Sequence, residues 1–429
     1  MRTSFFVLAG LLLTGLARSQ TTVSSDGTDN AVGPSIAVFT STEETPRTII
    51  RIAYVNGSVV SGHLQPGTAI TVKDYTSAMS LIGERSVTIS ATIKKYTQPR
   101  LSRDGLGITF FGSTGAGNVG PNGVWFAALS PNPYSSTGTV SASLAPYNGV
   151  SGTGLESIGT GIMGVYARPP AISNSNSGVF TIVWSDLFAE GEESGGEEEP
   201  PPPYTPLMRW TTGTGVTDVS GTNNWTEPAV SADGTYLAYV SSAQVRRSYS
   251  STRAWGGGTI ITISTYGGNN GNAASGEPQI DSSGSYIVFS TLASNLRASD
   301  DNAMQDVYYW ASGTLSLAYT DPGECAGGYA RNPSISPDGT YVGFESTNTN
   351  FLYSTVDYDG RGGPFAYRVQ PGSSGTPTLM SRTTGSPIPA RLGGNTNVAD
   401  GGHFVFDSSD TGIASGDTRT GIDVIYRAS

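Results

Sequence analysis

Apolar and polar positions alternate in short runs along this chain, and the clearest runs stand in pairs around a turn. In P-S-I-S-P-D-G-T-Y-V-G-F-E-S, residues 333–346, Ile335 supplies the apolar position of the first run and Tyr341 opens the second. Asp338 and Gly339 lie between the runs, where glycine can adopt a positive φ and aspartate can bond to its own backbone. Two such runs, rich in β-branched and aromatic residues, predict a β-hairpin.

The hairpin pattern recurs at steps of roughly 50 to 70 residues, a spacing typical of propellers and solenoids. Further copies occupy, in chain order, residues 99–113, 170–185, 228–241, 278–290 and 397–408. Residues 33–41 keep both strand cores but have lost the turn between them. Each interval after a hairpin holds further strand-like runs, such as residues 306–310 and 315–319, so each unit predicts a four-stranded sheet.

These units predict an all-β fold, a β-propeller, because blades set around an axis bury both faces of every sheet and protect the strand edges. Seven hairpins predict seven four-stranded blades, and six is the alternative if residues 33–41 belong to another element. Residues 423–427 resemble the third strand of a blade and residues 21–28 the fourth. We therefore expect the two ends of the chain to share one blade and close the ring, within a single domain spanning residues 20–429.

The P-x-I-S-x-D-G-x-Y-V-x-F-x-S hairpins resemble the TolB-type propeller repeat, also called the WD40-like or PD40 repeat. The segments S-D-D-N-A-M-Q-D-V-Y-Y (residues 299–309) and G-D-T-R-T-G-I-D-V-I-Y (residues 416–426) are similar to a segment that follows the hairpin in secreted, bacterial-style versions. The resemblance is good from about residue 224 onward and loose before it. It implies the fold and leaves activity open, because propellers serve as lectins, hydrolases, scaffolds and periplasmic adaptors.

The first residues have the pattern of a cleaved secretory signal, residues 1–19. Arg2 provides the positive start, residues 5–13 the apolar run, and residues 17–19 a small-x-small cleavage site. The apolar run is too short to span a bilayer, and no later run is long enough either. We expect a soluble, exported, monomeric protein, which in a bacterium would be periplasmic or at the cell surface.

The formal net charge of −11 narrows the range of partners. It argues against nucleic acid, whose phosphates require a basic surface, and against anionic membranes. A glycan or an extracellular protein remains as the expected partner. An acidic and proline-rich insertion at residues 189–204 predicts a solvated loop between strands.

Carboxylates in several intervals suggest a calcium site as the one cofactor to consider. Asp357 and Asp359 alternate and precede a glycine, which resembles the way a calcium loop gathers oxygen ligands, although the terminal bidentate glutamate is absent. A plain Asx-turn is the alternative that we favour, because the position repeats between blades. The related carboxylates are Asp300, Asp306, Asp417 and Asp423.

Aromatic side chains offer a second kind of candidate site, because their faces can stack on sugar rings. Trp225, Trp255 and Tyr204 lie in or beside predicted loops, and we expect them to be exposed for this role. Asn56 and Asn224 begin N-x-S/T sequons, which permit glycosylation if the source is eukaryotic.

Catalytic motifs are scarce, and we predict no catalytic residue. The chain has two histidines, of which His403 occupies the strand-start position held by Tyr341 in another unit, and it has no G-x-S-x-G elbow. The sequence therefore predicts a non-enzymatic binding or scaffold protein for a glycan, matrix polymer or protein. The alternative is a carbohydrate-active hydrolase or lyase with carboxylates at the ring centre, which a cluster of Asp or Glu at the channel mouth would favour.

Overall fold

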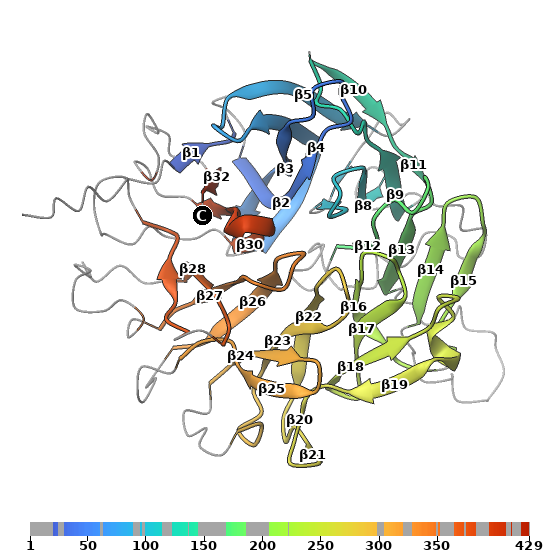
Figure 1. Cartoon of the computed structure of the whole chain (residues 1–429), viewed down its shortest axis with the longest axis vertical. Coiled ribbons are helices and arrows are strands. Elements are labelled where there is room, and N and C mark those ends of the chain that lie inside the picture. Colours follow the sequence, from blue (N-terminus) through green and yellow to red (C-terminus); the bar gives the residue numbers. More distant parts are fainter. Residues whose placement is uncertain are drawn as a thin grey trace, which may run out of the picture.

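The computed structural model confirms a seven-bladed β-propeller, in which the blades follow one another in chain order around a central axis (Figure 1). Six of the blades contain four strands, and the first blade carries a fifth strand at its outer edge. The structure describes residues 20–24, 30–60, 63–88, 95–96, 99–113, 122–135, 137–144, 169–185, 206–221, 223–297, 304–320, 328–348, 351, 364–372, 375–382, 394–408, 413 and 422–428.

Each blade begins with an inner strand that faces the axis and pairs with an antiparallel second strand. From blade 1 to blade 7 the inner strands are β2 (Asn30–Thr40), β7 (Arg100–Leu101), β12 (Ala171–Ile172), β16 (Thr226–Val230), β22 (Ser275–Ile280), β26 (Ala330–Ile335) and β30 (Gly394–Val398). The second strands are β3 (Thr48–Val60), β8 (Gly107–Ser113), β13 (Thr181–Ser185), β17 (Tyr236–Ser241), β23 (Tyr286–Thr291), β27 (Val342–Ser346) and β31 (Phe404–Ser408).

The third and fourth strands complete each blade toward the outside of the ring. The third strands are β4 (His63–Thr76), β9 (Asn122–Ala128), β14 (Leu207–Thr211), β18 (Gln244–Tyr249), β24 (Asp306–Ala311), β28 (Phe365–Val369) and β32 (Asp423–Arg427). The fourth strands are β5 (Leu81–Thr88), β11 (Ser143–Leu144), β15 (Val216–Asp218), β19 (Thr259–Thr262), β25 (Thr314–Leu317), β29 (Thr378–Leu379) and, for blade 7, β1 (Gln20–Thr22).

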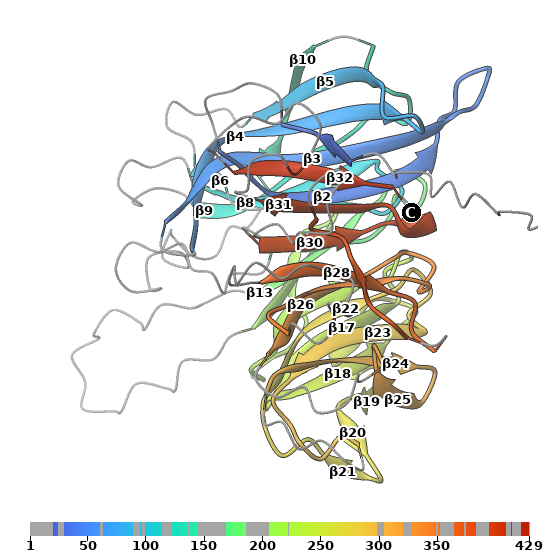
Figure 2. The ribbon, with the colours of Figure 1, turned by 90° about the vertical axis from the view of Figure 1, so that its left-hand side faces the viewer.

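The last blade is completed by the N-terminal strand, as the sequence predicts. β1 pairs with β32, with Gln20 opposite Arg427 and Thr22 opposite Ile425. The Ser24 hydroxyl extends this closure by donating a hydrogen bond to Asp423 at 2.6 Å. Figure 2 shows β1's partner β32 lying beside β31 and β30 in one sheet.

Burial between blades explains why apolar residues alternate along the strands. Among the described residues, buried apolar side chains form seven clusters, one for each pair of neighbouring blades. Phe344 and Tyr367 of blade 6, for example, pack with Val288 and Tyr309 of blade 5. Each sheet is thus covered on both faces, and the ring rather than the single blade is the unit of packing.

Blade 1 departs from the repeat in size and in its edge. Its strands β2, β3 and β4 span 11, 13 and 14 residues, while the second strands of the other blades span 5 to 7. Strand β10 (Gly138–Ser141), which follows β9 in the chain, leaves blade 2 and pairs in parallel with β5. This added strand covers the outer edge of blade 1, a pairing that the hairpin pattern did not predict.

The remaining elements are short. Strand β6 (Lys95–Tyr96) bridges β4 of blade 1 and β8 of blade 2, and β20 (Thr265–Tyr266) pairs with β21 (Asn269–Asn270) as a small hairpin outside blade 4. Two 3-10 turns, η2 (Trp255–Gly257) and η4 (Asp400–Gly402), are described. No helix among the described residues is both long and apolar enough to cross a membrane.

Candidate functional site at the propeller axis

The D-G-x-Y signature of the hairpins works between blades rather than within one. Gly339 in the turn of blade 6 has φ +74°, and a β-carbon there would overlap the ring of Tyr286 in blade 5. Gly284 in the turn of blade 5 has φ +75° and meets Tyr236 of blade 4 in the same way. The motif therefore places a glycine where the preceding blade's tyrosine needs space and where the backbone needs a left-handed conformation.

The hairpin turns of blades 2 to 7 are joined into a continuous chain of hydrogen bonds on one face, which we call the turn face. Backbone N–H groups donate to carbonyl or carboxylate oxygens of the neighbouring blade, which is the preceding blade for Ser175 and the next blade for the others. In order around the axis these bonds are Ser175 N to Asp104 Oδ2 (2.6 Å), Asn174 N to Ala232 O (2.8 Å), Ala232 N to Ser282 O (3.0 Å), Ser282 N to Pro337 O (2.8 Å) and Asp338 N to Asp400 Oδ1 (2.9 Å).

A second set of bonds joins the blades at the opposite end of the inner strands. Five of these strands contain a β-bulge with one residue in the left-handed region, namely Gly33, Glu227, Glu277, Asn332 and Asn395. The N–H of that residue points to a side-chain oxygen of the preceding blade. The acceptors are Ser185 Oγ for Glu227, Glu227 Oε2 for Glu277, Glu277 Oε2 for Asn332, Glu345 Oε1 for Asn395 and Asp407 Oδ2 for Gly33.

We call Glu227, Glu277, Glu345 and Asp407 the carboxylate belt. Burial, reinforced by the charge of Glu345, raises the pKa of Asp407 to about 8, although the Gly33 N–H and the Asn395 amide oppose the shift. Burial also raises the pKa of Glu345, against the hydrogen bond from Asn332. Because both side chains are at most 1% exposed and accept bonds from the next blade, they hold the ring together and do not face a substrate.

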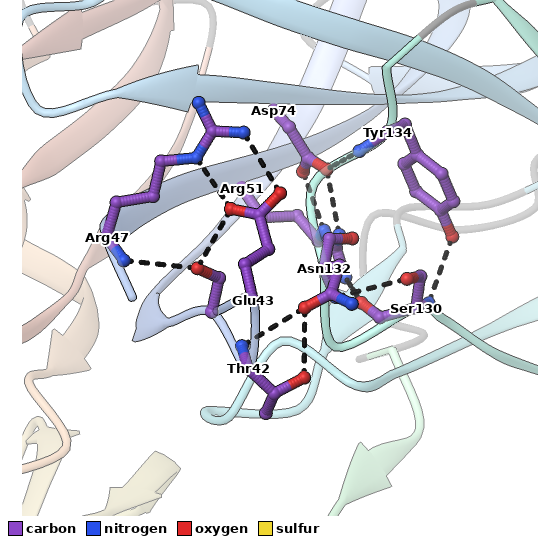
Figure 3. A network of polar contacts seen from close by, with 9 residues as sticks. Thr42, Glu43, Arg47, Arg51, Asp74, Ser130, Asn132 and Tyr134 are labelled. Carbon is purple, nitrogen blue, oxygen red and sulfur yellow. Dashed lines mark hydrogen bonds and ion pairs between the residues drawn. The ribbon is translucent and has the colours of Figure 1, made fainter. Parts of the chain in front are cut away.

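Blade 1, which has no such turn, is joined to blade 2 by a buried arginine (Figure 3). Arg51 is fully buried and forms a two-pronged ion pair with Asp74, at 2.7 and 2.8 Å. Its Nη1 donates to the carbonyl of Gly105, the turn glycine of blade 2, at 2.6 Å, and to that of Ser130 at 2.9 Å. The Asp74 carboxylate also accepts the N–H of Tyr134, so one ion pair fixes two segments of blade 2.

The axis itself contains a small cavity of about 60 Å³ that residues of all seven inner strands help to line. Its wall is mostly apolar or neutral, with two arginines from blade 2. The lining residues are Ser35, Ile36, Arg100, Leu101, Arg103, Pro169, Ala171, Ile172, Pro228, Ala229, Val230, Gln279, Ser334, Ile335, Pro337, Asn397 and Val398. No carboxylate belongs to this described wall, so the acidic cluster that would favour a glycosidase is not found there.

The two tryptophans that we expected at the surface are buried, which corrects that expectation. Trp225 is 4% exposed and stacks on Tyr239 with ring centroids 4.0 Å apart. Trp255 is fully buried, and its indole N–H donates to Thr235 O at 3.1 Å. Both belong to the apolar cluster between blades 3 and 4, where each ring buries a large apolar area. Neither can stack on a sugar from solution.

Two of the six candidate calcium ligands fall on described residues, and both have structural partners. Asp306 and Asp423 open the third strands of blades 5 and 7 and are each 3% exposed. Tyr319 donates its hydroxyl to Asp306 at 2.6 Å, just as Ser24 does to Asp423. The described residues contain no group of three His, Cys, Asp or Glu able to hold a metal ion.

The other candidates lie outside the described residues or at positions that leave their role a prediction. Asp300, Asp357, Asp359, Asp417, Tyr204 and the insertion at 189–204 lie outside the described ranges. Asn224 is exposed, whereas Asn56 is half-buried within β3 between two partner strands, so Asn224 is the more accessible sequon. His403 packs within blade 7, where its Nδ1 lies 2.6 Å from the hydroxyl of Tyr426.

Comparison with known proteins finds only distant likenesses to solved structures. No family model and no curated protein matches the chain. Among solved structures, the Dos1 propeller is 11% identical with a TM-score of 0.45, covering 96% of this chain and 94% of that one. An oligogalacturonate lyase in complex with manganese is 10% identical (TM-score 0.45, covering 94% and 98%), and TolB from Acinetobacter baumannii is 11% identical (0.40, covering 81% and 79%).

Proposed function

We propose that this chain is an exported, non-enzymatic binding protein whose rigid ring presents loops to a glycan, a matrix polymer or an extracellular protein. The observation that carries the proposal is the narrow axis. A cavity of about 60 Å³ holds only a few water molecules, since each needs about 10–15 Å³ of such space, and a sugar ring does not fit. The belt carboxylates are committed to bonds between blades, which leaves them poorly suited to acid–base chemistry.

The longer connections favour the face opposite the turn face as the binding surface. Neighbouring strands of a blade are antiparallel. The second strand of each blade therefore ends on that face, and the third strand begins there. In four blades the connection between them is long, at residues 186–206, 292–305, 347–364 and 409–422. Loops carried on a rigid scaffold are where binding residues most often occur. The turn face, by contrast, is occupied by short turns bonded to one another.

The alternative of a hydrolase or lyase with central carboxylates has no support in the described wall of the axis. Asp407 and Glu345 are enclosed between blades, and the cavity wall provides arginine, serine and amide side chains instead. A reducing-end assay with neutral and acidic polysaccharides tests this alternative directly. Turnover abolished by substituting one carboxylate of the belt, in a variant that keeps its melting temperature, would replace the binding proposal with the enzymatic one.

The binding proposal is tested by screening the mature protein, residues 20–429, on a glycan array and against an extracellular matrix extract, with calcium and with a chelator. Replacing residues 349–363 by a Gly-Ser linker of equal length preserves β27 and β28 and provides the matched variant. We expect the wild type to bind and the variant to lose binding while keeping its melting temperature. Asp357→Asn with Asp359→Asn tests whether calcium contributes.

A result with no binding partner in either screen contradicts the proposal. Binding that survives removal of each long connection in turn would place the contact elsewhere on the ring. Export is tested separately, by determining the N-terminal residue of the secreted chain, which we expect to be Gln20.

A further inference from the structure

The central cavity has two polar side chains in its wall, Arg103 and Ser334, that each leave one buried atom without a partner among the described residues. Arg103 follows β7 in the turn of blade 2 and contributes to the wall of the cavity, as does Arg100 from the same blade. The Nη1 atom of Arg103 is buried and donates to no acceptor among the described residues. The hydroxyl of Ser334, which lines the same cavity from blade 6, is also buried without a described partner.

A buried donor without an acceptor is costly, and more so when it belongs to a charged group. Most buried polar groups in proteins have a partner, so an exception at a cavity wall points to a ligand or to water. An arginine is well suited to a planar oxyanion, because its guanidinium N–H groups match the two oxygens of a carboxylate.

The nearest charges do not remove this capacity. Burial lowers the pKa of Arg103 to about 10, with Asp281 and Asp400 opposing the shift, so the guanidinium keeps its charge at neutral pH. The two oxygens of Asp281 accept bonds from Ser283 and from the N–H of Tyr286 within their own turn. Asp400 accepts the N–H of Asp338 in the chain of turns. These carboxylates balance the charge of Arg103 at a distance without forming a hydrogen bond to it.

The size of the cavity limits what can enter. A volume of about 60 Å³ gives room for a group of roughly four to six heavy atoms, judged by the space that a single water requires. We propose that the axis is a binding site for a small carboxylate, or for the carboxylate end of a larger ligand, with Arg103 as its principal donor. This site is separate from the loop-bearing face and does not depend on the proposed function.

Isothermal titration with acetate and with acetamide tests the site, because the two molecules have the same shape and only acetate carries the charge. We expect acetate to bind at least tenfold more tightly than acetamide. Arg103→Gln should weaken acetate binding by at least tenfold, and Arg103→Lys, which keeps the charge but not the planar donors, should weaken it less. Sulfate serves as a further probe that separates planar from tetrahedral oxyanions.

Arg47→Gln is the matched control, because it removes one arginine from an exposed position in blade 1 and should leave acetate binding unchanged. Equal binding of acetate and acetamide, or no binding of either up to about 0.1 M, which means an affinity weaker than about 1.4 kcal/mol, overturns the proposal and assigns the cavity to water. If Arg103→Gln fails to fold, the comparison of acetate with acetamide on the wild type still decides the question.

Discussion

Blade 1 and blade 4 are each joined to the next blade by an arginine, and the two arginines differ in burial. Each sends an arginine to the carbonyl of the next blade's turn glycine, Arg51 to Gly105 and Arg247 to Gly284, both at 2.6 Å. Arg247 is half-buried, lies over aromatic rings and belongs to a blade whose turn is also bonded to the next turn. Arg51 is fully buried and paired with a carboxylate.

The difference in burial between the two arginines shows what replaces the D-G turn in blade 1. Between blades 4 and 5 the bond from Ala232 N to Ser282 O joins the two turns, and the arginine adds to it. Blade 1 lacks the D-G turn, so on the turn face it is joined to blade 2 by the ion pair of Arg51 and by the rings of Phe39 and Tyr134 around it. Thr42 adds bonds to Asn132, and β6 and an apolar cluster join the two blades elsewhere. A repeat that loses its signature thus keeps its place through a buried polar contact specific to one position.

The largest effect should come from Arg51→Met, which leaves the Asp74 carboxylate buried without its partner. Removing one member of a buried ion pair costs about 3–5 kcal/mol, and denaturant unfolding of the variant measures the loss. Arg247→Met is the comparison in blade 4. It should cost about 1–2 kcal/mol, because it removes one hydrogen bond to a carbonyl and no ion pair.

Adding Asp74→Asn to Arg51→Met should recover part of the lost stability, since the double variant no longer buries an unpaired charge. Equal losses for Arg51→Met and Arg247→Met would show that the two blades are joined with similar strength. That result would mean that burial of the arginine makes no difference to the connection.

Gly339→Ala should be the next most damaging change. It places a β-carbon against Tyr286 in a left-handed conformation, and the backbone contributes about 1–2 kcal/mol of this cost. Steric overlap should add about 1–3 kcal/mol. Gly372→Ala isolates the two contributions, because Gly372 has φ +82° and nothing within 4 Å of a β-carbon. Thermal unfolding of both variants should show the larger shift for Gly339, and equal shifts would argue against packing between blades.

Stability should fall as the pH rises from the pKa that Asp407 has in the unfolded chain to the higher pKa that it has in the folded protein. The pKa of Asp407 is about 8 in the folded protein and about 3.9 in an unfolded chain, so the folded state holds the extra proton between these values. Each pH unit in that window should cost up to about 1.4 kcal/mol. Asp407→Asn should flatten the dependence while keeping an acceptor for Gly33. An unchanged slope in this variant would assign the dependence to other groups.

The smallest effect should come from the exposed ion pair of blade 1, which lies beside the buried one in Figure 3. Arg47 and Glu43 are 2.8 Å apart with side chains 46% and 33% exposed. Glu43→Gln should therefore change the free energy of unfolding by less than about 1 kcal/mol, and added salt should reduce the difference further. A loss as large as that of Arg51→Met would show that the rim of blade 1, and not its buried pair, holds the blades together.

The fold was readable from the sequence because each hairpin carries its own local signals. Asp338-Gly339 marks a turn, Tyr341 marks the strand that follows, and the repeat of both along the chain implies neighbours for every sheet. Ring closure could be predicted for the same reason, since residues 423–427 resemble the third strand of a blade and residues 21–28 the fourth. Periodicity and turn chemistry are local properties, and a repeat fold is built from local units.

The axis was not readable, because its residues meet only once all seven blades are in place. Arg103 lines the cavity together with residues from the other blades, and Gly33 bonds to Asp407 across the chain. No motif or regular spacing in the sequence connects these residues. The tryptophans misled for a related reason. Trp225 and Trp255 lie beside glycines and polar residues that suggest exposed loops, yet these segments fold back over the gap between blades 3 and 4. One signal for the bulges is visible in the sequence. Residues with a positive φ, such as Glu277, stand in an E-P or N-P pair near the start of an inner strand.

The pairing of β1 with β32 also sets the order in which this protein can fold. Ser24 and Asp423 bond across a sequence separation of 399 residues, so the first strand must wait until the last has been synthesised. During translation the early blades therefore form an open arc whose two end sheets lack their neighbours. The entropy of closing so long a loop grows only slowly with its length, by about 0.6 kcal/mol per doubling. A circular permutant cut between blades should therefore remain thermodynamically stable while refolding along a different route.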